Sequence, residues 1–334
     1  VWMWNMYVGM MTADLSSSTL DFIKAIGVNH VCAVDHRAFG FDRQGYWDAE
    51  PLADLRRHVE AHGIRLDMVS LPLPQVNVDQ AEMPNIMLGT PGRDEEIERI
   101  IKCIRAAARA GIPAVKGNLC VTGVLRTEPE KGRGGAMHTA FDLSRLKLPL
   151  PGIPEVSAEQ AWERIAYFVE RVIPAAEEAG VRVAIHPHDP AVPRGLGLDH
   201  RVLGDLEGLR KYCALSPSPY HGLNFCQGCM EESGCGQEAL LDAIRAFGRE
   251  KRLFMVHFRT VRGGPLRWRE AFIDEGDMDM VVAMRAYQEV GYEHMIVPDH
   301  YPRIPGDSPW GHQTRAYASG YLKALVAATG GESA

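Results

Sequence analysis

The sequence of 334 residues lacks the features that mark several large classes of protein. No uninterrupted apolar run approaches the roughly 18 residues that a membrane-spanning helix requires. Basic residues do not predominate, since the net charge is −7 and the pI about 6.0, whereas nucleic-acid-binding surfaces are basic. "TADLSSS", not a G-x-G-x-x-G fingerprint, follows the first apolar run, which argues against a dinucleotide-binding fold. We therefore expect neither a membrane nor a nucleic acid as a partner.

Cysteine is scarce and odd in number, with seven residues spread over the chain. Disulfide frameworks belong to short secreted chains, so free thiols in a reducing cytoplasm are the better interpretation. Residues 1–11 are apolar but have neither a charged start nor a small-residue cleavage site, so we expect no signal peptide. Cys226 and Cys229 have the C-x-x-C spacing of a disulfide or a zinc knuckle, yet no second close pair accompanies them. A third interpretation is that one of them is a ligand of a site whose other members are distant in sequence.

Short β-rich apolar runs alternate with longer amphipathic stretches along the chain. The expected strands are residues 6–10, 30–34, 64–70, 113–118, 181–186, 220–226, 252–258 and 294–299. The stretches between them carry helix signals, such as the capping-box pattern that begins at Ser157 and the glycine stop at Gly111. Eight strand–helix units in near-strict alternation predict an α/β fold, a single (β/α)8 TIM barrel that occupies residues 1–334 as one domain.

Residues 119–156 interrupt this alternation, because they are rich in glycine, proline and charge. They follow the fourth expected strand, at the end of the barrel where active sites lie. Long loops inside compact domains are usually lids or binding loops. We therefore predict a lid-like loop at this position.

Four consecutive expected strands have a side chain that can bind a metal ion at or near their ends. These residues are His186, Cys226, His257 and Asp299. Nitrogen, thiolate and carboxylate donors together suit a divalent transition metal such as Mn, Fe, Co or Zn, whereas a magnesium site built from oxygens alone would not use cysteine. Packing explains any one of these residues alone, but it does not readily explain four at successive strand ends. We therefore interpret Cys226 as a metal ligand and Cys229 as a bystander.

Further polar residues are expected at the same end of the barrel. They are His36, Asn118, Arg126, His188, Arg259, Asp277 and Asp279. Such a group suits the binding of an anionic, polyhydroxylated ligand. For the two aspartates, a role as helix N-terminal charges is about equally well supported. His300 stands beside Asp299, where it could act as an acid or base on a metal-bound substrate.

Several stretches of the sequence resemble motifs of the mannonate dehydratases, which are xylose-isomerase-like TIM barrels. The similar stretches are "GTPGRDEEIERI", "AGIPAVKGN", "RTE", "AIHPHDP", "NFCQG", "VHFR", "DEGDMDM" and "PDH", and they span nearly the whole chain. The resemblance implies dehydration of a sugar acid, D-mannonate to 2-keto-3-deoxy-D-gluconate in the family, with Mn²⁺ or Fe²⁺. It also implies the metal ligands His186, Cys226, His257 and Asp299, with His300 as a catalytic residue.

The sequence departs from the pattern of this family at four positions. Val297 stands where an arginine usually precedes "PDH", and Tyr301 stands where a glycine usually follows it. His188 replaces an aspartate of the family's "HPDDP" motif. Trp310 stands at or near the position of a tyrosine thought to be catalytic, and an indole has no ionisable hydroxyl. Tyr301 is our candidate to supply a phenol in its place.

Three functions remain open at this point. The first is dehydration of a mannonate-type sugar acid by metal-assisted β-elimination. There His300 takes one acid–base role, and His36, His188 and Tyr301 are the candidates for the other. The second is an isomerase, an epimerase or a dehydratase of another sugar or sugar acid on the same metal barrel. The third is a metal-stabilised sugar-acid-binding protein without turnover. A homo-oligomer is expected only by analogy with similar barrels.

Overall fold

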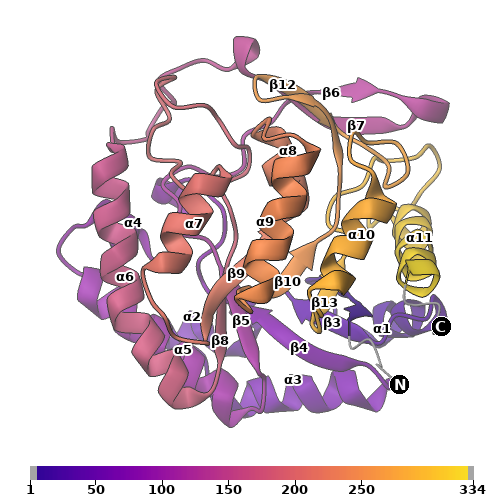
Figure 1. Ribbon diagram of the computed structural model, residues 1–334. Coiled ribbons are helices and arrows are strands. Elements are labelled where there is room, and N and C mark those ends of the chain that lie inside the picture. Colours follow the sequence, from indigo (N-terminus) through magenta and orange to yellow (C-terminus); the bar gives the residue numbers. More distant parts are fainter. Residues whose placement is uncertain (1–5, 330–334) are drawn as a thin grey trace.

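The computed structural model describes residues 6–329, so part of the stretch considered for a signal peptide, residues 1–5, lies outside the described residues. The larger of its two sheets is entirely parallel and has the strand order β1-β13-β10-β9-β8-β5-β4-β3-β2 (Figure 1). Its strands are β1 (Tyr7–Val8), β2 (Met10–Thr12), β3 (His30–Ala33), β4 (Arg65–Ser70), β5 (Ala114–Gly117), β8 (Arg182–Ile185), β9 (His221–Cys226), β10 (Leu253–His257) and β13 (Met295–Val297). Each of the eight expected strands is present.

The first expected strand closes the barrel because its two halves pair with different neighbouring strands. Its first half, β1, pairs with β13, and its second half, β2, pairs with β3. Gly9 lies between the halves, and its N–H donates to the carbonyl oxygen of Ile296 at 2.9 Å. A Cβ atom at Gly9 would lie 2.1 Å from the sulfur of Met295, so this close approach requires glycine. The predicted (β/α)8 barrel is therefore confirmed.

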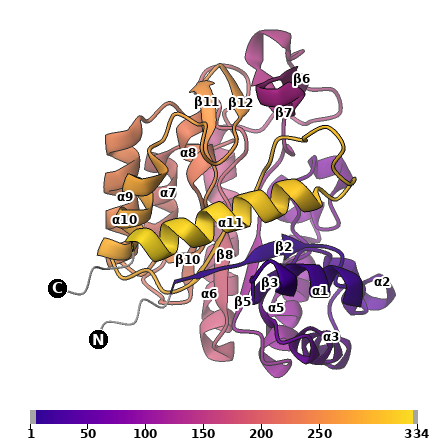
Figure 2. The same ribbon diagram turned by 90° about the vertical axis from the view of Figure 1, so that its right-hand side faces the viewer.

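Helices surround the barrel, as the two views in Figures 1 and 2 show. The longer helices are α1 (Ser17–Ala25), α3 (Ala49–Ala61), α5 (Arg93–Arg109), α6 (Ala158–Ala179), α7 (Leu206–Ala214), α9 (Gln237–Arg249), α10 (Met280–Glu289) and α11 (His312–Thr329). The shorter helices are α2 (Phe41–Gln44), α4 (Pro84–Leu88) and α8 (Gln227–Glu232). The capping box expected at Ser157 is confirmed at the start of α6, where Ser157 and Gln160 bond to each other's backbone. Within the described residues, no helix is both long and apolar enough to cross a bilayer.

Successive residues along each strand point alternately outward, toward the helices, and inward, toward the barrel interior. On β8, Val183 and Ile185 belong to the large core between the sheet and the helices, while Ala184 belongs to a smaller cluster inside the barrel. This inner cluster also contains Met255 on β10 and Val297 on β13. Because side chains alternate along a strand, the inward positions nearest the C-terminal ends of the strands line the mouth of the barrel.

The predicted lid-like loop is not confirmed as a loop, because residues 119–156 contain the strands β6 (Thr127–Lys131) and β7 (Met137–Asp142). These strands join β11 (Val261–Gly264) and β12 (Arg267–Glu270) in an antiparallel sheet of order β11-β12-β7-β6. The pairing gives backbone groups of the insertion hydrogen-bond partners that a loop would lack. Both views place this second sheet beyond the end of the barrel where its strands terminate (Figures 1 and 2). A lid function for it stays a prediction.

Candidate metal centre

The four predicted metal ligands meet at the mouth of the barrel. Ligand atoms of His186, Cys226, His257 and Asp299 all lie within 4.8 Å of one another. His257 Nδ1 is 3.1 Å from His186 Nε2 and 3.2 Å from Asp299 Oδ2. Each side chain is almost fully shielded from solvent, and a cluster of this composition at this spacing is expected to hold a cation.

The register of neighbouring strands brings these side chains together. Cys226 is the last residue of β9 and pairs with His257, the last residue of β10, which in turn pairs with Val297 on β13. His186 directly follows β8, and Asp299 lies two residues beyond Val297. All four occupy inward positions in the strand alternation, so one sector of the mouth receives all four donors.

Hydrogen bonds orient the two imidazoles toward the centre of this cluster. His186 Nδ1 donates to the carbonyl oxygen of Pro187 at 2.6 Å, which leaves the lone pair on Nε2 facing His257. Asn224 Nδ2 lies 3.0 Å from His257 Nε2, while Asn224 Oδ1 is buried without a hydrogen-bond partner among the described residues. Turning this amide by 180° would let its oxygen accept a proton from Nε2 and free the Nδ1 lone pair for a metal ion.

The protonation states of the cluster also fit a divalent cation. Burial lowers the pKa of His186, which favours the neutral imidazole that metals bind. Burial opposes the Cys226 thiolate, but the hydrogen bond from Cys229 and the charge of Arg259 hold the pKa of Cys226 well below its usual range. Burial likewise opposes the Asp299 carboxylate, yet the nearby His257 and His300 hold its pKa well below its usual range. The site therefore offers two anionic donors together with imidazole nitrogen.

Arg259 links the predicted ligands to a network of buried carboxylates. Its guanidinium lies 2.7 Å from Glu232, 3.2 Å from Glu270 and 3.5 Å from Asp299. Only 2% of the Arg259 side chain is exposed. A Cβ atom at Gly228 would lie 2.4 Å from the guanidinium, so the glycine of "NFCQG" makes room for Arg259 against α8. Removing Arg259 or one of these carboxylates would leave a buried charge uncompensated. We therefore infer that this network fixes the geometry around Asp299.

A second cluster of metal-binding side chains adjoins the first and contains Asp189, Cys229 and Glu232. Arg259 Nη2 contacts all three, at 3.4 Å from Asp189, 3.3 Å from the Cys229 sulfur and 2.7 Å from Glu232. The guanidinium therefore occupies the position that a second cation would need. Arg126 completes the network with a two-pronged ion pair to Asp189, at 2.5 and 2.8 Å. We interpret this cluster as an ion-pair network.

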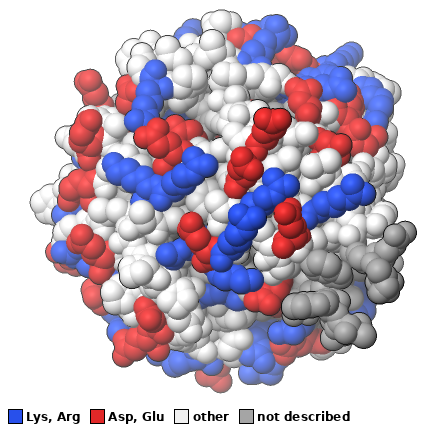
Figure 3. All heavy atoms as spheres, viewed as in Figure 1, with Lys and Arg blue, Asp and Glu red and all other residues white. Residues whose placement is uncertain are grey.

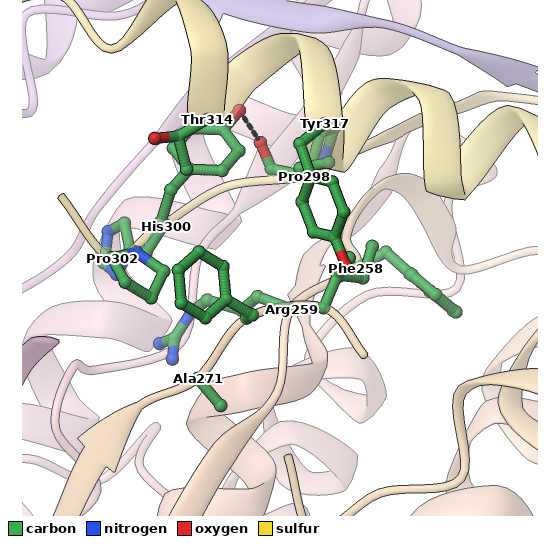
Figure 4. A pocket seen from close by; sticks show the side chains of 12 residues that line it. Phe258, Arg259, Ala271, Pro298, His300, Pro302, Thr314 and Tyr317 are labelled. Carbon is green, nitrogen blue, oxygen red and sulfur yellow. Dashed lines mark hydrogen bonds between the residues drawn. The ribbon is translucent and has the colours of Figure 1, made fainter. Parts of the chain in front are cut away.

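His300 stands between the metal cluster and the buried carboxylates. Its Nδ1 lies 2.7 Å from Glu270 Oε1, and its Nε2 lies 3.4 Å from Asp299 Oδ2. Burial disfavours the charged ring, but Asp299 and Glu270 raise the pKa of His300 to about 9. His300 and Arg259 line a small cavity of about 10 Å³, which has room for roughly one water molecule (Figure 4). The His300 side chain is 37% exposed, so solvent reaches part of the ring.

Comparisons with known proteins agree with this arrangement. The family model described as D-mannonate dehydratase (UxuA) matches residues 7–147 and 140–332. Mannonate dehydratase 2 of Halalkalibacterium halodurans is 28% identical over 314 residues, which cover 84% of this chain and 87% of that relative. The mannonate dehydratase of Thermotoga maritima is 30% identical over 321 residues, which cover 84% of each chain.

The chain belongs to the mannonate dehydratase family.

The structural comparison extends this finding to the whole fold. The crystal structure of mannonate dehydratase from Streptococcus suis serotype 2 superposes with a TM-score of 0.85 at 26% identity, covering 97% of this chain and 93% of that one. The similarity therefore includes the strands that carry the predicted ligands.

The residues predicted to bind substrate fall into separate groups. His36 and Asn118 line one pocket of about 190 Å³ at the ends of β3, β4 and β5. His36 Nε2 lies 2.9 Å from Glu82, and Asn118 Nδ2 donates to the carbonyl oxygen of Leu73 at 3.1 Å. Arg126 and Arg259 instead belong to the ion-pair network described above, where their guanidinium groups already face carboxylates.

Two further substrate-binding predictions receive no support from their contacts. His188 is buried, its Nε2 donates to Leu119 O at 2.8 Å, and its Nδ1 accepts from the N–H of Leu203 at 3.3 Å. Burial, aided by Arg201, lowers the pKa of His188 to about 3, so the neutral ring bridges backbone segments and has no nitrogen left for a ligand. Asp277 is exposed and accepts from the N–H of Gly263 at 2.9 Å.

Asp279 acts on the backbone of the next helix. Its side chain accepts from the N–H groups of Val281 and Val282 at 3.0 and 3.1 Å, where it caps the N-terminus of α10. This bears out the alternative of a helix N-terminal charge for Asp279.

Three positions at which the sequence departs from the family pattern have different surroundings. Val297 is fully buried inside the barrel and pairs with His257, so the wall beside this ligand is apolar. The Tyr301 hydroxyl donates to the carbonyl oxygen of Pro298, a bond drawn in Figure 4. Burial raises the pKa of Tyr301, so in this arrangement its phenol remains protonated. Trp310 packs edge-on against Phe22 and has no proton to exchange at neutral pH.

Several residues around the site escaped prediction. Glu270 lies on β12, and Glu232 is the last residue of α8, so neither occupies a strand end of the barrel. Asp189 belongs to "HPHDP" and Asn224 to "NFCQG", two motifs to which only neighbouring residues were assigned a role. The inward position of Asn224 on β9, two residues before Cys226, was the available signal.

Proposed function

We propose that this chain is a metal-dependent sugar-acid dehydratase that converts D-mannonate to 2-keto-3-deoxy-D-gluconate, with Mn²⁺ or Fe²⁺ held by His186, Cys226, His257 and Asp299. Membership of the mannonate dehydratase family supports the reaction class. The observation that carries the proposal is the convergence of these four donors beside His300, which is partly exposed and paired with Glu270. The odd number of cysteines, spread thinly along the chain, is the basis of our expectation of a reducing, cytoplasmic environment.

The proposed reaction removes water across C2 and C3 of the sugar acid. The bound divalent ion would supply Lewis-acid stabilisation of the negative charge that develops when the C2 proton leaves. The C2 proton passes to a base, and His36, which lines the adjoining pocket, is the remaining candidate for this role. As the C2–H bond breaks, its electron pair forms the C2–C3 double bond and the C3–O bond breaks. His300, whose Nδ1 lies 2.7 Å from Glu270, donates a proton to the departing hydroxyl, which leaves as water. The resulting enol then becomes the 2-keto acid by taking a proton from solvent at C3.

A second candidate is a metal-dependent isomerase or epimerase, or a dehydratase of a different sugar or sugar acid. The apolar wall formed by Val297 beside His257 favours it, because relatives usually carry an arginine before the "PDH" motif. Tyr301 also differs from a free catalytic phenol, since its hydroxyl is engaged by Pro298. Products of isomerisation keep the mass of the substrate, whereas dehydration lowers it by one water, so mass spectrometry of the product separates the two.

Metal removal provides the first test of the proposed function. Treating the reduced protein with a chelator is expected to lower formation of the 2-keto-3-deoxy acid from D-mannonate by about 10²–10³-fold, because Lewis-acid stabilisation contributes several kcal/mol. Mn²⁺ or Fe²⁺ should restore the rate and Mg²⁺ should not, since a thiolate ligand favours a transition metal. Metal content per chain is measured on the same samples. Undiminished turnover by metal-free protein would contradict the proposal.

A further inference from the structure

Lys116 carries its charge inside the barrel. It lies on β5 between Val115, which belongs to the outer core, and Gly117, and it shares the inward direction of Ala114 in the inner cluster. The Lys116 ammonium lies 3.1 Å from the sulfur of Met11, on the far side of β3 and β4 in the strand order. A thioether is a weak acceptor for an ammonium group that has three strong donors.

This lysine differs from the other cations at the mouth of the barrel. Arg126 and Arg259 each face buried carboxylates at 2.5 to 3.5 Å. Among residues 6–329, the Lys116 ammonium forms no ion pair with a carboxylate, and Met11 is its one hydrogen-bond partner there. Because shielding a charge from water is costly unless the charge is paired, a half-buried lysine in this state favours an anionic ligand.

A pocket at the C-terminal ends of β3, β4 and β5 adjoins this lysine. The pocket has a volume of about 190 Å³, and its polar lining includes His36, Ser70, Gln75, Lys116 and Asn118. The pocket-lining strand β5 pairs with β8, and the N–H of His186, which follows β8, donates to the carbonyl oxygen of Gly117 in the pocket lining at 3.0 Å. A small polyhydroxylated acid held at the metal cluster could therefore extend into this pocket.

We propose that Lys116 binds a carboxylate of the substrate and thereby selects sugar acids over neutral sugars and polyols. This inference rests on the proposed function, since it identifies how the same site recognises its substrate class. The carboxylate is either the C1 group of an aldonate or the second carboxylate of an aldarate, and both place a fixed negative charge beside the ammonium. A charge-assisted hydrogen bond of this kind strengthens binding by about 10–100-fold.

The test compares ligands of one stereochemistry that differ in charge, namely D-mannonate, D-mannarate and the neutral D-mannitol. The 334-residue protein reconstituted with Mn²⁺ is used as the wild type and as Lys116→Met, a substitution that suits an interior already lined by methionines. Affinity is measured as KM from initial rates where a ligand is turned over, and by calorimetry where it is not. We expect Lys116→Met to weaken the binding of one or both acids by about 10–100-fold and to leave the affinity for D-mannitol unchanged.

Two further variants control for effects on the fold. Lys116→Arg keeps the charge and should retain most of the affinity for the acids. Lys102→Met, on the exposed face of α5, should leave the affinity for all three ligands unchanged. Metal content per chain should equal that of the wild type in all three variants, which shows that the metal cluster is intact.

The pattern across the three ligands decides the inference. Weaker binding of D-mannonate assigns Lys116 to the C1 carboxylate. Weaker binding of D-mannarate alone assigns Lys116 to a second carboxylate. Equal losses for D-mannitol and the acids, or no loss for either acid, would overturn the inference, as would a wild-type protein that binds neither acid. Acids that bind through Lys116 without forming a 2-keto product would contradict the proposed dehydration and leave the role of Lys116 intact.

Discussion

Replacing Cys226 by serine is expected to remove the bound metal and to lower turnover of D-mannonate by about 10³-fold. The hydroxyl of serine stays protonated at neutral pH, so the variant loses the anionic sulfur donor that Arg259 and Cys229 stabilise. The cluster then keeps the two imidazoles and a single anionic donor, Asp299. Metal per chain and the initial rate of 2-keto acid formation are measured on the same preparation.

The matched control for this variant is Cys235→Ser. Cys235 is half-buried after α8, and its sulfur contacts the carbonyl oxygen of Met230 at 3.2 Å, away from the predicted ligands. We expect this control to retain both metal and turnover. A Cys226→Ser protein with a full metal complement and wild-type turnover would show that the thiolate is not a ligand.

Replacing His300 by asparagine is expected to lower turnover by about 10²–10⁴-fold, the usual contribution of one acid–base group, without loss of metal. Asparagine can still donate a hydrogen bond toward Glu270, but it has no proton to give to a departing hydroxyl. The rate of the first turnover reports the loss of acid catalysis, and the metal content shows whether the metal site is intact.

His62→Asn is the corresponding control. His62 Nδ1 also lies beside a carboxylate, at 2.9 Å from Asp21, but this pair joins α3 to α1 outside the barrel mouth. Its substitution should leave turnover unchanged. If His300→Asn keeps both its metal and its turnover, another group protonates the leaving hydroxyl. If it loses the metal as well, His300 supports the cluster and its acid role is unproven.

The barrel could be predicted from the sequence because each of its strands is a local signal, a short apolar run bounded by helix starts and stops. The division of the first strand at Gly9 could not, since it depends on Met295 and Ile296, which the chain supplies almost 290 residues later. The strands of the insertion were also missed. β6 reads "TEPEK", which is polar and contains proline, and it becomes a strand only by pairing with β7 beside the distant hairpin of β11 and β12.

The candidate ligands were predictable for the same local reason, since each ends a strand or lies within two residues of its end and all four take the inward direction. Their supporting residues were not, because position in the chain does not reveal them. Glu270 reaches His300 only through the second sheet, and Glu232 reaches Arg259 only because Gly228 leaves space beside α8. His188 looked equally promising in sequence, yet backbone contacts engage both of its nitrogens.

The exposed surface carries little functional information by comparison. Basic and acidic side chains are interspersed over the face shown in Figure 3. Exposed ion pairs such as Arg267–Glu130, at 3.0 Å, contribute only about 0–1 kcal/mol to stability. The charges with consequences for chemistry are those enclosed at the mouth of the barrel, where burial and close pairing fix their positions.

The reaction of D-mannonate in D2O, followed by NMR with fully Mn²⁺-loaded protein under reducing conditions, tests the central claim most directly. Dehydration through an enol predicts 2-keto-3-deoxy-D-gluconate that carries deuterium at C3, formed at a rate that falls with the metal content of the protein. Two results would contradict the account. One is D-mannonate that stays unchanged beside a full metal site. The other is deuterium at C2 of a sugar acid that keeps its C3 hydroxyl, which is the result of epimerisation.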